Sequence, residues 1–80
     1  MKKLETINRV LTSTLRPEDK ALLVELLMRA NDEGVSWPRV ARLCQVRGIK
    51  HEKNFKGVDT YLPGLVKVIK KGRDNEYRLN

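Results

Sequence analysis

The chain has 80 residues, of which 40% are hydrophobic and 34% are charged, and its formal net charge is +7. This length fits one domain with a small core, which leaves little room for a deep catalytic cleft, and the composition is that of a folded domain rather than a disordered one. The single cysteine excludes an internal disulfide. We therefore expect a reducing, cytoplasmic location, and because no run is long enough to cross a bilayer we expect no membrane partner.

Basic residues are concentrated in the second half of the chain. Residues 1–34 contain six basic and six acidic side chains, whereas residues 35–80 contain eleven basic and four acidic ones. A localised positive field attracts polyanions and accelerates encounter with them. Solubility alone does not require this confinement to one half, so the asymmetry favours a nucleic-acid partner.

The first predicted element is a short helix over residues 2–12. Leu4, Ile7 and Leu11 recur there at spacings of three and four residues, which is one face of a helix. Fewer than three heptads argue against a long coiled coil. We expect this helix to pack on its own domain, and a homodimer formed through Leu4, Ile7 and Leu11 is the alternative.

The main scaffold helix is predicted over residues 17–33. Pro17 fits its first turn, and the carboxylates of Glu18 and Asp19 complement the positive end of the helix dipole. The apolar stripe of this helix consists of Leu22, Leu23, Leu26, Leu27 and Ala30. Gly34 is expected to be the glycine that ends it.

The next helix is expected in the segment SWPRVARLCQVRG. Ser36 is its predicted N-cap, Pro38 belongs to its first turn, and Gly48 ends it. Its apolar face consists of Trp37, Val40, Ala41 and Cys44. We therefore interpret Trp37 as an anchor of the core rather than as a platform for a stacked base, and Cys44 as a buried structural thiol.

A third helix of the core is predicted over residues 53–62. Apolar residues recur with helical spacing at Phe55, Val58, Leu62 and Leu65. The Pro-Gly pair at 63–64 would end the helix. The alternation of Val58, Thr60 and Leu62 leaves a strand as the alternative.

The chain closes with a predicted β-hairpin over residues 65–80. Its first arm is rich in β-branched residues, residues 72–75 supply turn chemistry, and residues 76–79 alternate polar and apolar. The side chains that must pack on the helices are Val66, Val68, Tyr77 and Leu79, because an isolated hairpin is marginal in water.

From Pro17 to the last residue, this order of helices and basic hairpin resembles the winged helix-turn-helix family. The segments SWPRVARLCQVRG, FKGVDTYLPGL and VKVIKKGRDNEYRLN carry the resemblance, and Tyr77-Arg78-Leu79 matches the family's habit of placing a leucine shortly after an aromatic in the last wing strand. The phrase LPGLVKV is also similar to a winged-helix subtype associated with RNA and protein partners. The resemblance implies a mainly α fold with a C-terminal β-hairpin. Its parts would be an N-terminal helix at 1–14, a helical core at 15–64 and the wing at 65–80.

The resemblance further implies binding to double-stranded DNA, with the third helix in the major groove and the wing on the backbone or in the minor groove. Carried onto this chain, the nucleic-acid-binding residues are Arg39, Arg42, Lys50, Lys53, Asn54, Lys56, Lys70, Lys71 and Arg73. Asn54 is the candidate for reading adenine, whereas the lysines would meet phosphates. Ser36 and Arg39, at a helix N-terminus, are candidates for holding a phosphate.

Two other functions stay open. One is a protein-interaction module or inhibitor that docks on an acidic protein surface, and the other is RNA binding, against which the scarcity of aromatic residues argues. A nucleophile-base pair of Cys44 and His51 is disfavoured because Cys44 lies on the apolar face. No spacing predicts a zinc site or a glycine-rich phosphate loop, so we expect no enzyme activity, no metal and no cofactor.

Overall fold

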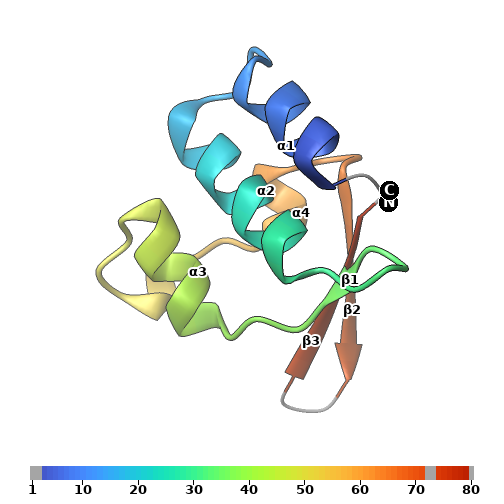
Figure 1. The fold of residues 1–80 in the computed structure, drawn as a ribbon. Coiled ribbons are helices and arrows are strands. Elements are labelled where there is room, and N and C mark those ends of the chain that lie inside the picture. The colour runs from blue at the N-terminus through green and yellow to red at the C-terminus, as the bar shows by residue number, and fades with distance from the viewer. Residues whose placement is uncertain (1–2, 72–73, 80) are drawn as a thin grey trace.

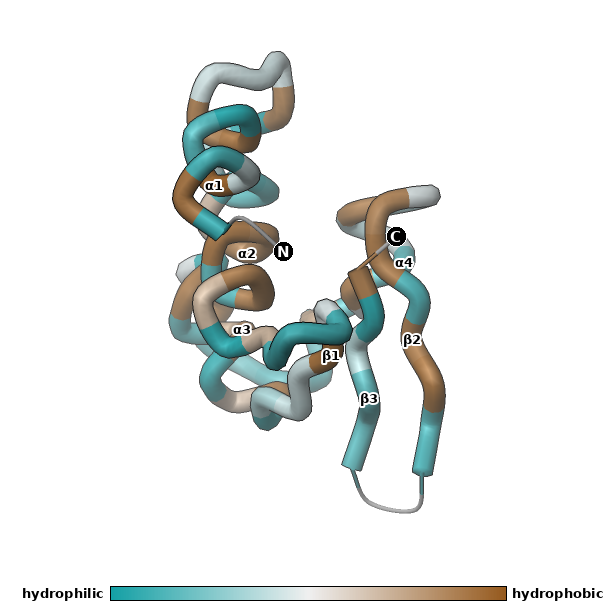
Figure 2. The backbone as a smooth tube through the Cα atoms, turned by 45° about the vertical axis from the view of Figure 1, so that its right-hand side comes forward, coloured by the Kyte–Doolittle hydropathy of each residue, from teal (hydrophilic) through white to brown (hydrophobic). Residues whose placement is uncertain are grey.

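The computed structural model describes residues 3–71 and 74–79. In this part of the chain, four α-helices, one short 3-10 helix and a three-stranded antiparallel sheet form an α/β domain (Figure 1). The elements in chain order are α1 (Lys3–Leu11), α2 (Pro17–Arg29), β1 (Val35–Ser36), α3 (Val40–Arg47), the 3-10 helix η1 (Glu52–Asn54), α4 (Val58–Tyr61), β2 (Val66–Lys71) and β3 (Asp74–Leu79). Helices α1, α2 and α3 lie together on one side, and β2 and β3 lie on the other (Figure 2).

The sheet has the strand order β1-β3-β2, with both pairs antiparallel. The predicted hairpin is confirmed in β2 and β3, whose register begins with Val66 opposite Leu79. The predicted turn is too long, because Asp74 and Asn75 belong to β3 and pair with Lys71 and Lys70. The predicted inner face of the hairpin is confirmed as well. Val66 and Tyr77 are buried in the core, and Val68 and Leu79 pack against that core partly buried.

Strand β1 overturns the prediction of a helix that begins at Ser36. Val35 and Ser36 pair with β3, so Ser36 lies in the sheet, 1% exposed, instead of capping a helix. Pairing with β3 holds Val35 and Ser36 extended, and Pro38 disfavours a helical backbone at Trp37, the residue that precedes it. The extended backbone continues to Arg39, at φ −76° and ψ 151°, and α3 begins at Val40. The fold therefore contains a third strand that a mainly α fold with one hairpin lacks.

The predictions for α3 hold at its end but not at its start. Trp37 is 54% exposed between β1 and α3, so its interpretation as a core anchor is wrong. Gly48 ends the helix in the left-handed conformation, and Cys44 is buried, as predicted. Burial raises the pKa of the Cys44 thiol, and the charge of Glu52 adds to the effect. A raised pKa fits a structural thiol rather than a nucleophile.

Helix α2 is the central scaffold, and its predicted apolar stripe is confirmed. Leu22 and Leu26 are fully buried. The helix ends earlier than predicted, at Arg29, and Gly34 lies at φ 79° in the turn that leads to β1. The side-chain Oδ1 of Asn31 accepts hydrogen bonds from two backbone N–H groups of this turn. An asparagine turn thus replaces the predicted glycine cap.

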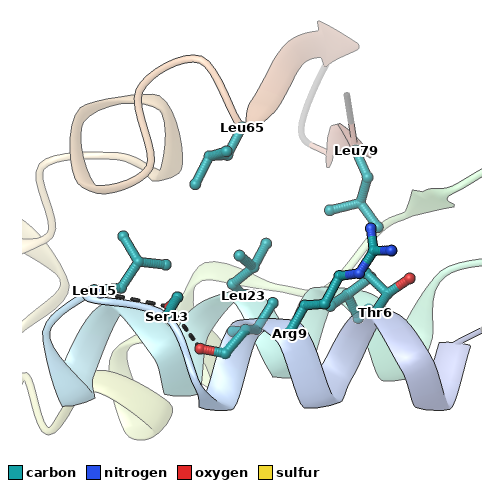
Figure 3. A pocket seen from close by; sticks show the side chains of 9 residues that line it. Thr6, Arg9, Ser13, Leu15, Leu23, Leu65 and Leu79 are labelled. Carbon is teal, nitrogen blue, oxygen red and sulfur yellow. Dashed lines mark hydrogen bonds between the residues drawn. The ribbon is translucent and has the colours of Figure 1, made fainter.

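Helix α1 packs on its own domain through Ile7 of the predicted face and through Val10, which the prediction did not include. Its Thr6 and Arg9 line a pocket with Leu65 and Leu79 (Figure 3). Val10 is buried and Ile7 packs against the core, whereas Leu4 is 85% and Leu11 is 55% exposed. The helix lies against α2, and Lys3 Nζ donates a hydrogen bond to the C-cap carbonyl of α2. The homodimer stays a prediction, and of its three predicted contact residues Leu4 and Leu11 are the exposed ones.

The segment predicted to form a helix over 53–62 is broken into two short pieces. Helix η1 ends at Asn54, and α4 begins only at Val58. Gly57 lies between them at φ 118°, a conformation that residues with side chains rarely adopt, so the chain turns there instead of continuing a helix. Val58 and Leu62 are nevertheless buried, as the helical spacing predicts, and the strand alternative is wrong.

Candidate nucleic-acid interface

Two adjoining cavities lie between the start of α3, the segment that leads into α4, and the β2-β3 hairpin. Their volumes are about 480 and 530 Å³, and both are lined by Val40, Asn75 and Tyr77. The smaller cavity is completed by residues 38–41, Glu52 and Asp74, and the larger one by residues 55–60, Val68 and Lys70. Because the two cavities share a wall, we treat them as one depression, the hairpin groove.

Basic side chains surround the hairpin groove. Arg39 lines its smaller cavity, and Lys56 and Lys70 line its larger one. Lys50 and Lys53 line neither cavity but are exposed on the connection between α3 and α4, of which Glu52 and residues 55–57 line the groove. Within residues 3–71 and 74–79, none of these five cations makes an ion pair. Their charges are therefore available to an anionic ligand.

Carboxylates restrict where an anion fits in the hairpin groove. Glu52 and Asp74 line the smaller cavity, and Asp59 lines the larger one. The wall that the cavities share is neutral and polar, since Asn75 Nδ2 donates a hydrogen bond to Tyr77 Oη at 3.3 Å. Like charges repel, so phosphates would be held by the lysines at the rims of the groove rather than at its carboxylate-lined walls.

Two of the predicted contact residues are already engaged in ion pairs. Arg42 Nε donates to Glu25 Oε1 at 2.8 Å, and Lys71 Nζ donates to Glu76 Oε1 at 3.1 Å. Both side chains remain partly exposed, but their charges are balanced by carboxylates of the scaffold. They are weaker candidates for phosphate contacts than the unpaired cations of the hairpin groove.

The remaining predicted site residues are dispersed. Asn54 is exposed at the end of η1, on the connection between α3 and α4, and its contact with adenine stays a prediction. Arg73 lies outside the described residues. Ser36, predicted to hold a phosphate beside Arg39, is buried in β1 and does not reach the surface.

Two buried carboxylates connect the elements that carry this surface. Glu25 on α2 accepts hydrogen bonds from Arg42 on α3 and from Arg29, and the bond from Arg42 lowers the pKa of Glu25 by more than burial raises it. Glu76 on β3 accepts a hydrogen bond from Arg78 at 2.6 Å, which is the largest of the effects that lower the pKa of Glu76. Both carboxylates are thus held in the charged form.

These lowered pKa values predict a loss of stability in acid. A carboxyl group whose pKa is lower in the folded state stabilises the protein above its unfolded pKa, and that contribution disappears as the pH falls through the folded value. We expect the melting temperature to be steady near neutral pH. It should fall once the pH drops below 4.5, the ordinary pKa of glutamate. Thermal melts across pH should show a shallower acid fall for Glu25→Gln. The control Glu18→Gln removes an exposed carboxylate and should keep the steep profile; equal profiles for the two variants would contradict the prediction.

A largely buried arginine packs on the tyrosine that holds the segment with Lys56. Arg47 on α3 pairs with Asp19 on α2, and the two side chains are 14% and 15% exposed. The guanidinium carbon of Arg47 lies 3.6 Å from the centre of the Tyr61 ring, and Tyr61 Oη accepts the backbone N–H of Lys56 at 3.1 Å. Sequence reasoning missed this role because Asp19 and Arg47 are 28 residues apart.

Other classes of site find no support in the described part of the chain. Its His, Cys, Asp and Glu side chains form no group of three that could hold a metal ion. No helix there combines the length and the apolar character needed to cross a membrane. Comparisons with protein-family models, with curated proteins and with solved structures gave no match. Function therefore has to be inferred from the surface itself.

Proposed function

We propose that the chain is a winged helix-turn-helix domain whose wing is the β2-β3 hairpin. The order of elements supports this proposal, since α2, β1, α3 and α4 precede the hairpin, and β1 joins the hairpin as a third strand beside β3. The domain departs from the winged helix-turn-helix pattern in α4, which takes the place of the recognition helix. With four residues it is about 6 Å long, which is too short to lie along a DNA groove and present a row of base-reading side chains.

We propose that this domain binds duplex DNA mainly through the phosphate backbone, as a regulator or accessory factor. The observation that carries the proposal is a set of unpaired cations: Arg39, Lys56 and Lys70 line the hairpin groove, and Lys50 and Lys53 are exposed on the connection between α3 and α4. Phosphate contacts supply affinity and orientation without sequence information. The shortness of α4 therefore predicts weak sequence preference, to which Asn54 would contribute most.

The salt dependence of duplex binding tests this function. If each of the five cations neutralises one phosphate, log K should fall with log salt with a slope of about −4.5. Fluorescence anisotropy of a labelled mixed-sequence duplex, titrated from about 50 to 200 mM salt, measures the slope. A chain that fails to bind at low salt, or binds without salt dependence, would contradict the proposal. The RNA alternative would appear as tighter binding to an RNA duplex of the same sequence.

A further inference from the structure

The outer face of the sheet carries an exposed tryptophan. Trp37 is the single tryptophan of the chain, and it is 54% exposed. It directly follows Ser36, which is buried and pairs with Tyr77 on the inner face of the sheet. Successive side chains of an extended chain point to opposite faces, so Trp37 belongs to the outer face. This face is opposite Tyr77, and β1 covers it at Val35, which is 3% exposed, whereas Trp37 is exposed two residues further along.

The backbone around Trp37 follows β3 beyond the end of β1. Pro38 and Arg39 line the same cavity as Asp74 and Asn75 of β3, so the chain continues beside β3 after Ser36. Extended by one residue, the register of Val35 with Arg78 and Ser36 with Tyr77 would bring Trp37 opposite Glu76. Pro38 is buried, which fixes the backbone next to the exposed ring. The exposed indole therefore lies just after the end of β1, next to a residue whose side chain is buried.

Three cations share the outer face with Trp37. The register aligns Arg78 with Val35 of β1 and with Lys67 of β2, and Lys71 lies further along the same face of β2. Lys67 is exposed and has no ion-pair partner among the described residues. Arg78 and Lys71 share the carboxylate of Glu76, yet their side chains remain 50% and 62% exposed.

The combination of an exposed ring and surrounding cations favours one kind of partner. Glu76 and Asp74 are the carboxylates of this face, and Glu76 is 3% exposed, so its charge is covered by the two cations that it binds. A protein partner with an apolar surface would leave Lys67 and the other cations desolvated without a counter-charge. A nucleotide supplies both an aromatic base for the ring and a phosphate for the cations.

We propose that the outer face of the sheet binds an unpaired nucleotide, whose base stacks on Trp37 and whose neighbouring phosphates meet Lys67 and Arg78. The bases of a duplex are already stacked on one another, so the partner is a single strand or a single-stranded flank of a duplex. The inference goes beyond the duplex binding proposed for the hairpin groove and does not require it. If both surfaces bind, the domain recognises a junction between duplex and single strand.

Tryptophan fluorescence tests the stacking directly, because Trp37 is the sole source of the signal. Stacking of a base on the indole is expected to quench the emission when an oligothymidylate is added, and a blunt duplex should quench much less. Saturation with the single strand, seen by anisotropy of a labelled oligothymidylate, without a change in emission would overturn the proposal. No binding of the single strand at low salt would overturn it too.

A set of variants gives an independent readout. Trp37→Ala should weaken oligothymidylate binding about tenfold or more, and Trp37→Phe should restore part of the affinity, because stacking needs an aromatic face. Leu11→Ala is the matched control, since Leu11 is exposed to a similar extent on α1. Equal affinities for Trp37→Ala and Leu11→Ala would overturn the proposal. Duplex affinity should be unchanged in all three variants, so this result is separate from the test of the hairpin groove.

Discussion

Replacing Lys56 and Lys70 together by glutamine is expected to weaken duplex binding on all sequences alike. The two lysines line the larger cavity of the hairpin groove, one from the segment before α4 and one from β2, and neither makes an ion pair in the described structure. If each contacts one phosphate, the variant should reduce the salt slope by about 1.8, which corresponds to at least about a tenfold loss of affinity near 0.1 M salt.

The matched control for this variant removes two charges from the other half of the chain. Arg9 and Arg16 are exposed near α1 and at the start of α2, and neither is ion-paired in the described residues. Arg9→Gln/Arg16→Gln lowers the net charge by the same amount, so a purely global attraction would make both variants equal. Equal salt slopes for the two variants would contradict the assignment of the hairpin groove, while a smaller slope for Lys56→Gln/Lys70→Gln alone supports it.

Elements with strong local signals could be predicted from the sequence. Pro17 and the leucine stripe define α2, and Gly48 defines the end of α3, because each signal acts within a few residues. The hairpin was equally predictable from its β-branched arm and from the alternation of polar and apolar residues at 76–79, although its turn was predicted two residues too long. These signals also gave the correct inner face of the hairpin, since side chains alternate strictly along a strand.

Strand β1 could not be predicted, because its two residues have no pattern of their own. Val35 and Ser36 are extended because they pair with Arg78 and Tyr77, more than forty residues later in the sequence. The mistake about Trp37 follows from this omission. Once the chain is in a strand up to Ser36, the tryptophan cannot lie on the apolar face of α3. Its single local signal was Pro38, which disfavours helix at the preceding residue.

The basic character of the candidate site could be predicted from the sequence, but the ion pairing of its individual residues could not. The excess of basic residues after Val35 is visible in the sequence, yet the sequence does not show which of them are neutralised. Arg42 is paired because α2 brings Glu25 to it from 17 residues away. Lys71 is paired because the register of the hairpin places it diagonally across from Glu76. The separation of free from paired cations is thus a property of tertiary structure.

Arg47→Ala is expected to lower the free energy of unfolding by about 3 kcal/mol. Removing one partner of a largely buried ion pair leaves the charge of the other partner without compensation. The substitution leaves the Asp19 carboxylate largely buried and uncovers the Tyr61 ring. Urea denaturation followed by circular dichroism measures the loss. Arg29→Ala is the control, since Arg29 is half exposed in an i,i+4 pair and should cost less than about 0.5 kcal/mol. Equal losses for the two variants would show that Arg47 has no special role.

Arg47 also connects the stability of the domain to the position of the hairpin groove. Asp19→Ala/Arg47→Ala removes both charges, so it should be less destabilised than the sum of the two single variants. The double variant still lacks the cation above the ring of Tyr61, whose hydroxyl accepts the backbone N–H of Lys56. We therefore expect Arg47→Ala to weaken duplex binding, and we expect Asp19→Ala/Arg47→Ala to be more stable than Arg47→Ala while binding the duplex equally weakly. A double variant that regains both stability and duplex affinity would show that Lys56 is held in place without Arg47, and that the ion pair serves folding alone.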